Sequence, residues 1–177
     1  SKKLDNPVVK WVFDGWDLAG VTTFTSGAPL GIGYSLVSGA DIVGGGGAGV
    51  DSRVVLTGTP NLPKSERTEY RHFNVDVVRP PTKADFGIGN APKDPIRGPG
   101  INVFDVSLYK NIPLSHDEKR RLQFRFEFYN FFNHASFQGV DTGTRFDAAG
   151  KQVSTTVGNY TSTLDARRIV IGAKLYF

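Results

Sequence analysis

The chain contains no cysteine and no methionine, and it has no long apolar segment. Without cysteine it cannot form a disulfide framework, a thiolate zinc site or a thiol nucleophile. No run of eighteen apolar residues occurs, so we expect no transmembrane helix. The first residues, Ser-Lys-Lys-Leu-Asp-Asn-Pro, lack the apolar core of a secretory signal. Because methionine is missing, we expect a mature, processed or excised segment.

Sequence signals for catalysis and for metal binding are also missing. The stretch Gly44–Gly47 lacks the Lys-Ser/Thr and the strand-to-helix frame of a phosphate loop, which favours a flexible loop. The three histidines, His72, His116 and His134, contain no i,i+4 pair, which argues against a metal site. No Gly-x-Ser-x-Gly elbow occurs. We therefore expect no catalytic residues, no metal, no cofactor and no enzymatic activity.

Glycine and aromatic residues are plentiful: 21 of the 177 residues are glycine, and 12% are aromatic. Glycine combined with aromatics and alternating polarity is typical of β structure with many turns. The net charge of +4 is spread along the chain instead of forming a basic patch. We therefore expect an all-β protein and no nucleic-acid partner.

The clearest structural signal is a strict alternation of polarity in residues 121–128. The apolar positions are Leu122, Phe124, Phe126 and Phe128, and the polar ones are Gln123, Arg125 and Glu127, followed by Tyr129. A strand turns successive side chains to opposite faces, whereas a helix would scatter these phenylalanines around its circumference. The pattern predicts a strand with one apolar and one polar face.

The same alternation recurs in other segments. The last residues place Ile169, Ile171, Ala173, Leu175 and Phe177 on one face, and Arg168, Gly172, Lys174 and Tyr176 on the other, with Val170 as an exception. In Val103–Ile112, the alternate sets are Phe104, Val106 and Leu108 against Asp105, Ser107, Tyr109 and Asn111. Further strands are predicted at Trp16–Thr25 and Leu30–Leu36, with weaker ones at His72–Val77 and Val153–Thr163. We expect Val153–Thr163 to pair with the last strand.

Short and long connections alternate between these segments. Pro113–Asp117 predicts a tight turn, whereas Ser38–Asp51, Pro60–Gly100 and Gln138–Lys151 predict long loops. Outer-membrane barrels combine short periplasmic turns with long extracellular loops in this way. About six to eight strands fit the chain at the spacing of such barrels. Eight would close a small barrel, and fewer would form an arc of a larger one.

The phenylalanine-rich faces favour a membrane environment over water. In a soluble sandwich, inner faces pack on each other and are filled mainly by β-branched residues. In an outer-membrane barrel, apolar side chains meet lipid and polar ones meet the hydrated interior. We predict that Leu122, Phe124, Phe126, Phe128, Phe104, Val106 and Leu108 face lipid, and that Arg125, Glu127, Asp105 and Lys174 face the lumen. A water-soluble sandwich or lipocalin-like barrel is the alternative.

Residues near the strand ends suggest further roles. Trp11, Trp16, Tyr129, Phe131 and Phe132 fit an interfacial aromatic girdle. Asn130 and Asn133 are expected to order the turn after residue 129 by bonding to backbone. Arg125 and Glu127 are expected to satisfy their charges across strands; the alternative is a lumenal ion pair that contacts a plug or a substrate.

Four elements, in this order, resemble TonB-dependent receptors, and more closely the Oar-like subgroup. They are Gly15–Val21 with Thr25–Leu30, then Arg97–Asn111 (RGPGINVFDVSLYKN), then Arg121–His134 (RLQFRFEFYNFFNH) with Phe137, and finally Asp165–Phe177 (DARRIVIGAKLYF). The resemblance covers most of the chain except the loops. It implies a barrel of about twenty-two strands that is filled by an N-terminal plug and driven by TonB. Residues 1–177 would be the C-terminal part of that antiparallel transmembrane barrel, with the plug absent.

The resemblance also implies location and partners. In this family the final aromatic residue is read by the barrel-insertion machinery, and Phe177 matches it, with Leu175, Ala173, Ile171 and Ile169 on the same face. The expected setting is the outer membrane of a Gram-negative-type bacterium, and outer-membrane lipid is the expected neighbour. TonB would act only through the missing N-terminal part, and the transported large nutrient is not identified. The alternative functions are a small closed barrel with a structural or adhesive role and a soluble ligand-binding domain.

Overall fold

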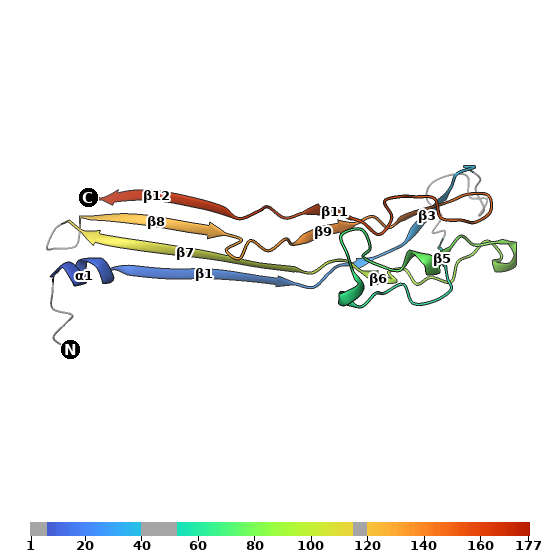
Figure 1. Ribbon diagram of the computed structural model, residues 1–177, viewed down its shortest axis with the longest axis horizontal. Coiled ribbons are helices and arrows are strands. Elements are labelled where there is room, and N and C mark those ends of the chain that lie inside the picture. Colours follow the sequence, from blue (N-terminus) through green and yellow to red (C-terminus); the bar gives the residue numbers. More distant parts are fainter. Residues whose placement is uncertain (1–6, 40–52, 115–119) are drawn as a thin grey trace. The chain divides into compact units, whose positions relative to one another are not determined.

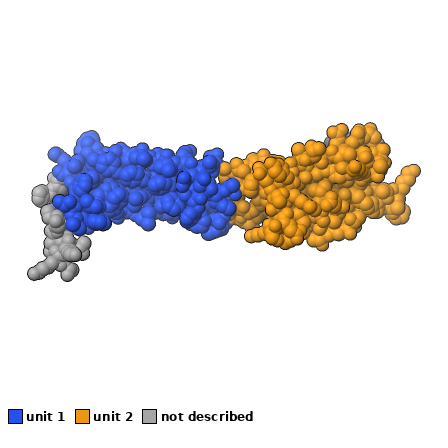
Figure 2. All heavy atoms as spheres, in the orientation of Figure 1, with its two compact units in different colours: residues 1–24, 102–135, 165–177 blue, residues 25–101, 136–164 orange. Residues whose placement is uncertain are grey.

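A computed structural model describes residues 7–39, 53–114 and 120–177, and these are mainly β structure (Figure 1). The chain divides into two compact units (Figure 2). Unit 1 comprises Ser1–Phe24, Asn102–Ala135 and Asp165–Phe177, and unit 2 comprises Thr25–Ile101 and Ser136–Leu164. In these described stretches, no helix has the length and apolar character needed to span a membrane.

Unit 1 is built around a four-stranded sheet. Its elements are α1 (Pro7–Phe13), β1 (Trp16–Thr25), β7 (Ile101–Pro113), β8 (Arg121–Tyr129) and β12 (Arg168–Tyr176). The strand order is β1-β7-β8-β12, so each strand pairs with a neighbour that the alternation of polarity already predicted as a strand. The expected strand Trp16–Thr25 is confirmed at both ends, and the one predicted at Val103–Ile112 is slightly longer in the structure.

The register of the sheet brings like residues onto like faces. Leu108 lies opposite Phe126, which in turn lies opposite Ile171. One residue further along each strand, Tyr109 lies opposite Arg125, and Arg125 lies opposite Gly172. Directly opposed residues of antiparallel strands share a face. The three period-two patterns therefore add up to a sheet with one apolar and one polar side.

Unit 2 consists of short strand pairs around its own core. The pairs are β2 (Pro29–Leu30) with β6 (Ile96–Arg97), β3 (Gly33–Leu36) with β10 (Gly143–Phe146), β4 (Val55–Leu56) with β5 (Val78–Arg79), and β9 (Phe137–Val140) with β11 (Tyr160–Thr163). Three 3-10 turns, η2 (Lys64–Glu66), η3 (Val75–Val77) and η4 (Lys83–Asp85), complete it. Phe73 and Phe146, both fully buried, lie in the core.

Several predictions for this second unit were wrong. The strand expected at 30–36 is interrupted at residues 31–32. Residues 138–151, expected to be a loop, contain most of β9 and the whole of β10. The segment His72–Val77 turns into η3 because the Asn74 side chain accepts a hydrogen bond from the Asp76 N–H. Only Tyr160–Thr163 of the segment 153–163 is a strand, and it pairs with β9; the last strand pairs with β8 instead.

The expected total of six to eight strands also needs correction. In the described residues, four long strands form the sheet of unit 1, and eight strands of two to four residues lie in unit 2. The short strands lack the period-two signal because alternation needs several residues to become visible. Most of the glycine-rich stretch 38–51 and of the turn 113–117 lies outside the described residues. The hairpin itself is confirmed, because Pro113 pairs with Arg121 and the Leu114 N–H donates to the Arg120 carbonyl.

Two of the elements that carry the family resemblance meet in unit 2. Pro29 pairs with Arg97, and the Gly98 N–H donates to the Ala28 carbonyl at 2.8 Å. At this contact Gly27 lies directly against the Gly98 carbonyl, so that a Cβ atom at Gly27 would collide with it. The lack of a side chain at position 27 is therefore what allows these two segments to pair.

We expect Gly27→Ala to loosen this pairing, because backbone would have to move to accept the methyl group. The free energy of opening at the Gly98 N–H, measured by hydrogen exchange in the full-length protein, should fall by about 1–3 kcal/mol. Gly33→Ala is the matched control, since a Cβ there meets nothing within 4 Å. It should change this value by less than about 0.5 kcal/mol. Equal effects of the two substitutions would contradict the close-contact explanation.

Candidate functional site: the two faces of the four-stranded sheet

The apolar face of the unit 1 sheet is continuous across all four strands. Its residues are Trp16, Leu18 and Phe24 of β1, Phe104, Val106, Leu108 and Ile112 of β7, Leu122, Phe124, Phe126 and Phe128 of β8, and Ile169, Ile171, Ala173 and Leu175 of β12. The β1 residues join this face through contacts of the Phe24 ring with Phe104 and of the Trp16 ring with Lys110. Phe177 follows β12 and is 98% exposed.

This face has no apolar core behind it. Among the described residues, the buried apolar side chains are Ile32, Val54, Val55, Leu62, Phe73, Val78, Ala91, Ile96, Phe146 and Val157. All of them belong to unit 2. In unit 1, by contrast, Leu18 is 74% exposed and Ile171 is 69% exposed. A water-soluble sheet of this kind would cover such residues with a second layer.

Aromatic rings gather at one end of the apolar face. Phe24, Phe104, Phe132, Phe131 and Phe128 form a chain of edge-to-face contacts with centroid distances of 5.0–5.7 Å. Such T-shaped pairs are favoured by the ring quadrupole and add to the energy of burial. Phe131 and Phe132, predicted as part of an aromatic girdle, therefore extend the apolar face beyond the end of β8.

A chain of hydrogen bonds crosses the polar face. Asn111 Nδ2 donates to Asp17 Oδ2 at 2.7 Å, and Gln123 Nε2 donates to Asn111 Oδ1 at 2.8 Å. Arg125 Nε then donates to Gln123 Oε1 at 2.8 Å. The hydroxyl of Tyr176 closes the chain with a 3.3 Å bond to the same Gln123 oxygen. One network thus links side chains of all four strands.

Cations on this face also stack on tyrosine rings. Arg125 lies over Tyr109 and Lys174 over Tyr176, with distances to the ring centroids of 5.6 and 4.6 Å. Glu127 accepts a hydrogen bond from the Tyr129 hydroxyl. Arg125 also donates to the Tyr176 hydroxyl at 3.4 Å, so its charge has partners on both neighbouring strands, as expected. Glu127 differs, because the Tyr129 hydroxyl that it accepts from lies on its own strand.

The residues predicted to face lipid and those predicted to face the lumen do lie on opposite faces of the sheet. What each face touches stays a prediction, as does the role of Phe177, Leu175, Ala173, Ile171 and Ile169 in barrel assembly. Asp105, expected to face the lumen, accepts a hydrogen bond from the Asn130 N–H at 2.8 Å. Its carboxylate therefore stabilises the turn that follows β8.

The expected role of Asn130 and Asn133 is confirmed. Both adopt the left-handed conformation, with φ of 52° and 53°, which asparagine tolerates better than most residues. The Asn130 side chain bonds to the backbone of His134 and Asp165, and the Asn133 side chain accepts from the Arg167 N–H. These bonds tie the end of β8 to the approach of β12.

Lys110 is the residue that the sequence analysis missed. It lies on the apolar face, opposite Phe124, and is only 7% exposed. Its ammonium donates to the carbonyl oxygens of Trp11 at 2.7 Å, Val12 at 3.2 Å and Asp14, which lie at the C-terminal end of α1. An ammonium has three donors, so all of them are used. The sequence did contain a signal for this role: Lys110 is two positions after Leu108, so a strand places this lysine on the apolar face.

His72 is the buried histidine of unit 2, at 2% exposure. Its Nε2 lies 2.6 Å from the Arg97 carbonyl, and its Nδ1 lies 3.0 Å from the Tyr160 hydroxyl. Because a carbonyl only accepts, Nε2 carries the proton and Nδ1 accepts from Tyr160 in the neutral ring. Burial lowers the pKa of His72 from 6.5, and Arg67 lowers it further, against the opposing effect of the Arg97 carbonyl.

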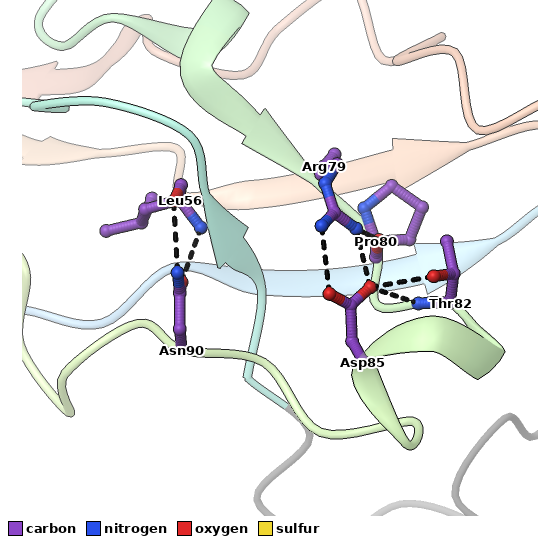
Figure 3. A network of polar contacts seen from close by, with 6 residues as sticks. All are labelled: Leu56, Arg79, Pro80, Thr82, Asp85 and Asn90. Atoms are coloured by element: carbon purple, nitrogen blue, oxygen red, sulfur yellow. Dashed lines mark hydrogen bonds and ion pairs between the residues drawn. The ribbon is translucent and has the colours of Figure 1, made fainter.

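Figure 3 shows a turn of unit 2 that is braced by contacts among Arg79, Thr82 and Asp85. Arg79 donates two hydrogen bonds to Asp85, at 2.7 and 2.9 Å, and Asp85 also accepts from the Thr82 N–H and hydroxyl. These contacts hold the pKa of Asp85 well below its ordinary value, the Arg79 contact most strongly. Phe86, which follows η4 at φ 54°, is 90% exposed. Nearby, the Asn90 amide bonds to both backbone groups of Leu56.

His72 lies in unit 2 and His134 in unit 1, and His116 lies outside the described residues. Among the residues that the structure describes, no group of three or more histidine or acidic side chains could hold a metal ion.

The lowered pKa of His72 predicts that unit 2 is less stable in acid. The unfolded chain binds a proton near pH 6.5 and the folded chain only at lower pH, so stability falls as the pH drops below about 6.5. The backbone N–H of His72 donates to the Gly158 carbonyl. The free energy of opening at this amide, measured by hydrogen exchange, should fall between about pH 7 and pH 5. His72→Gln should weaken the pH dependence, whereas His134→Gln, which alters an exposed histidine of unit 1, should preserve it. A flat profile in the unmodified protein would contradict the assignment.

Comparison with known proteins agrees with the two-faced sheet. The model of a family described as outer membrane beta barrel domain matches residues 1–170. No curated protein and no solved structure matches the chain. A match of this extent covers β1, β7 and β8, the first three residues of β12, and the residues that connect these strands. The chain therefore belongs to the outer membrane beta barrel domain family, and its location is the outer membrane of a Gram-negative bacterium.

Proposed function

We propose that the chain forms part of the wall of a TonB-dependent receptor of the Oar-like subgroup, through which a large nutrient enters the cell. In this role the apolar face of the unit 1 sheet meets the hydrocarbon of the outer membrane. The polar face meets the hydrated interior of the barrel. The chain acts as a structural wall and a pathway, not as an enzyme.

The observation that carries this proposal is the apolar face without a core. Its apolar side chains are exposed on β1 and β12 and half-buried on β7 and β8, while the fully buried apolar side chains of the described residues all belong to unit 2. Hydrocarbon is the environment that makes such a face favourable, because it removes the apolar surface from water. Strands β8 and β12 have nine residues each and β1 has ten, lengths that suit a tilted crossing of the bilayer.

The connections support a direction across the membrane. β7 and β8 are joined by the short segment 114–120, whereas the 75 residues 26–100 separate β1 from β7. Residues 130–167, which contain β9, β10 and β11, join β8 to β12. Outer-membrane barrels keep short turns on the periplasmic side and long loops outside. In this proposal α1 and the β7–β8 turn are periplasmic, and the segments of unit 2 are extracellular.

The assignment to TonB-dependent receptors rests on the order of the four resembling elements. The structure gives local roles to several of their residues: Asn130 and Asn133 order a turn, and Gly27 lies against Gly98. A small closed barrel with a structural or adhesive role remains the alternative. The soluble ligand-binding domain is disfavoured by membership of an outer-membrane family.

The orientation of the sheet can be tested by placing a charge on each face. Phe126→Arg should lower the free energy of unfolding of the full-length protein from lipid vesicles by about 2–4 kcal/mol, because arginine is costly at the bilayer midplane. Ser107→Arg puts the same charge on the polar face opposite Glu127 and should cost less than about 1 kcal/mol. Phe126→Leu controls for the lost ring. Equal costs for the two arginine variants would contradict the orientation.

The TonB dependence needs a separate experiment. The full-length protein should cross-link to TonB in living cells, and the cross-link should disappear when its segment upstream of Ser1 is deleted. The 177 residues alone should not form a closed, monomeric barrel in detergent micelles. Recovery of such a barrel, together with no cross-link to TonB, would favour the small structural barrel.

A further inference from the structure

The short helix α1 exposes apolar side chains next to the apolar face of the sheet. Val8 is 65% exposed, Trp11 61% and Phe13 70%. The helix has seven residues, of which Lys10 is the only charged one. Isolated helices of this length are unstable in water, so α1 depends on contacts with other groups. An exposed Trp, Phe and Val on so short a helix are characteristic of segments that lie in a membrane interface.

Lys110 anchors α1 to the sheet. The three carbonyl groups that accept from its ammonium are at the end of the helix where the backbone dipole is negative, which favours a cation. The ammonium also lies 5.1 Å from the centroid of the Trp16 ring, at the start of β1. The anchor therefore starts from the apolar face itself and fixes α1 at the edge of that face.

We infer that α1 lies in the plane of the periplasmic leaflet, where Lys110 holds it among phospholipid headgroups. This inference rests on the proposed function, because it extends the lipid-facing surface from the strands to the helix. The occupant follows from two features: the apolar face continues through Trp16 and Lys110 to α1, and the apolar side chains of the helix itself are exposed.

The depth of α1 can be measured with spin labels in the full-length protein, in vesicles of phosphatidylethanolamine and phosphatidylglycerol. The chain has no cysteine, so Trp11→Cys provides a single labelling site within it. Val8→Cys is a second site that leaves Trp11 in place. Phe126→Cys serves as the reference within the apolar face, and Phe86→Cys as the reference in unit 2. Power saturation with oxygen and with a water-soluble nickel complex then reports the depth of each label.

We expect labels at positions 8 and 11 at headgroup depth, the label at position 126 in hydrocarbon, and the label at position 86 in water. One outcome would overturn this inference alone. In it, the nickel complex reaches the labels at positions 8 and 11 as readily as the label at position 86, while the label at position 126 is still in hydrocarbon. A label at position 126 that is also in water would overturn the proposed function.

The anchor is tested by Lys110→Met, which keeps an unbranched apolar side chain but removes the ammonium. In the Lys110→Met protein, the label at position 8 should become several-fold more accessible to the nickel complex, because α1 is no longer bonded to the sheet through Lys110. The label at position 126 should be unaffected, which shows that the strands are still inserted. Unchanged accessibility at position 8 in the Lys110→Met protein would overturn the role assigned to Lys110.

Discussion

The alternation of side chains along an extended strand is the constraint on which the rest of unit 1 depends. With a period of two residues, each strand has two faces, and the pairing register decides whether like faces coincide. In the pairs β7–β8 and β8–β12, Phe126 lies between Leu108 and Ile171, so the apolar sides join into one surface. A slip of one residue would place Arg125 among these side chains. Register and environment are therefore coupled.

The polar side of the sheet shows how charge is tolerated in mid-strand. Arg125 has a hydrogen-bond partner on its own strand and a tyrosine ring on the neighbouring strand, while Glu127 receives a hydroxyl. Amide side chains such as Asn111 and Gln123 both donate and accept, so they connect groups that could not bond to each other directly. The resulting network is compatible with a wet surface, since each member can also bond to water.

The sequence was sufficient for the long strands and insufficient for unit 2. The alternation of polarity around Phe124, Phe126 and Phe128 predicts a strand because it persists over nine residues. Strands of two residues, such as Val55–Leu56, leave no period to detect, and their pairing depends on a core assembled from distant segments. Asn74 shows a second reason: its side chain turned a segment of β-forming residues into a 3-10 turn. Lys110 was missed because its partners are backbone groups nearly a hundred positions away in the chain.

The separate core of unit 2 has a consequence for how such a protein can diversify. Phe73, Phe146 and Ile96 belong to a core cluster whose described members all lie in unit 2, so the surface of this unit can accept changes that leave the strand pattern of unit 1 intact. A braced turn such as the one below Phe86 can then carry new side chains on an unchanged frame. Substitutions on the surface of unit 2 therefore need not disturb the strand pairing of unit 1, so the two units can change at different rates.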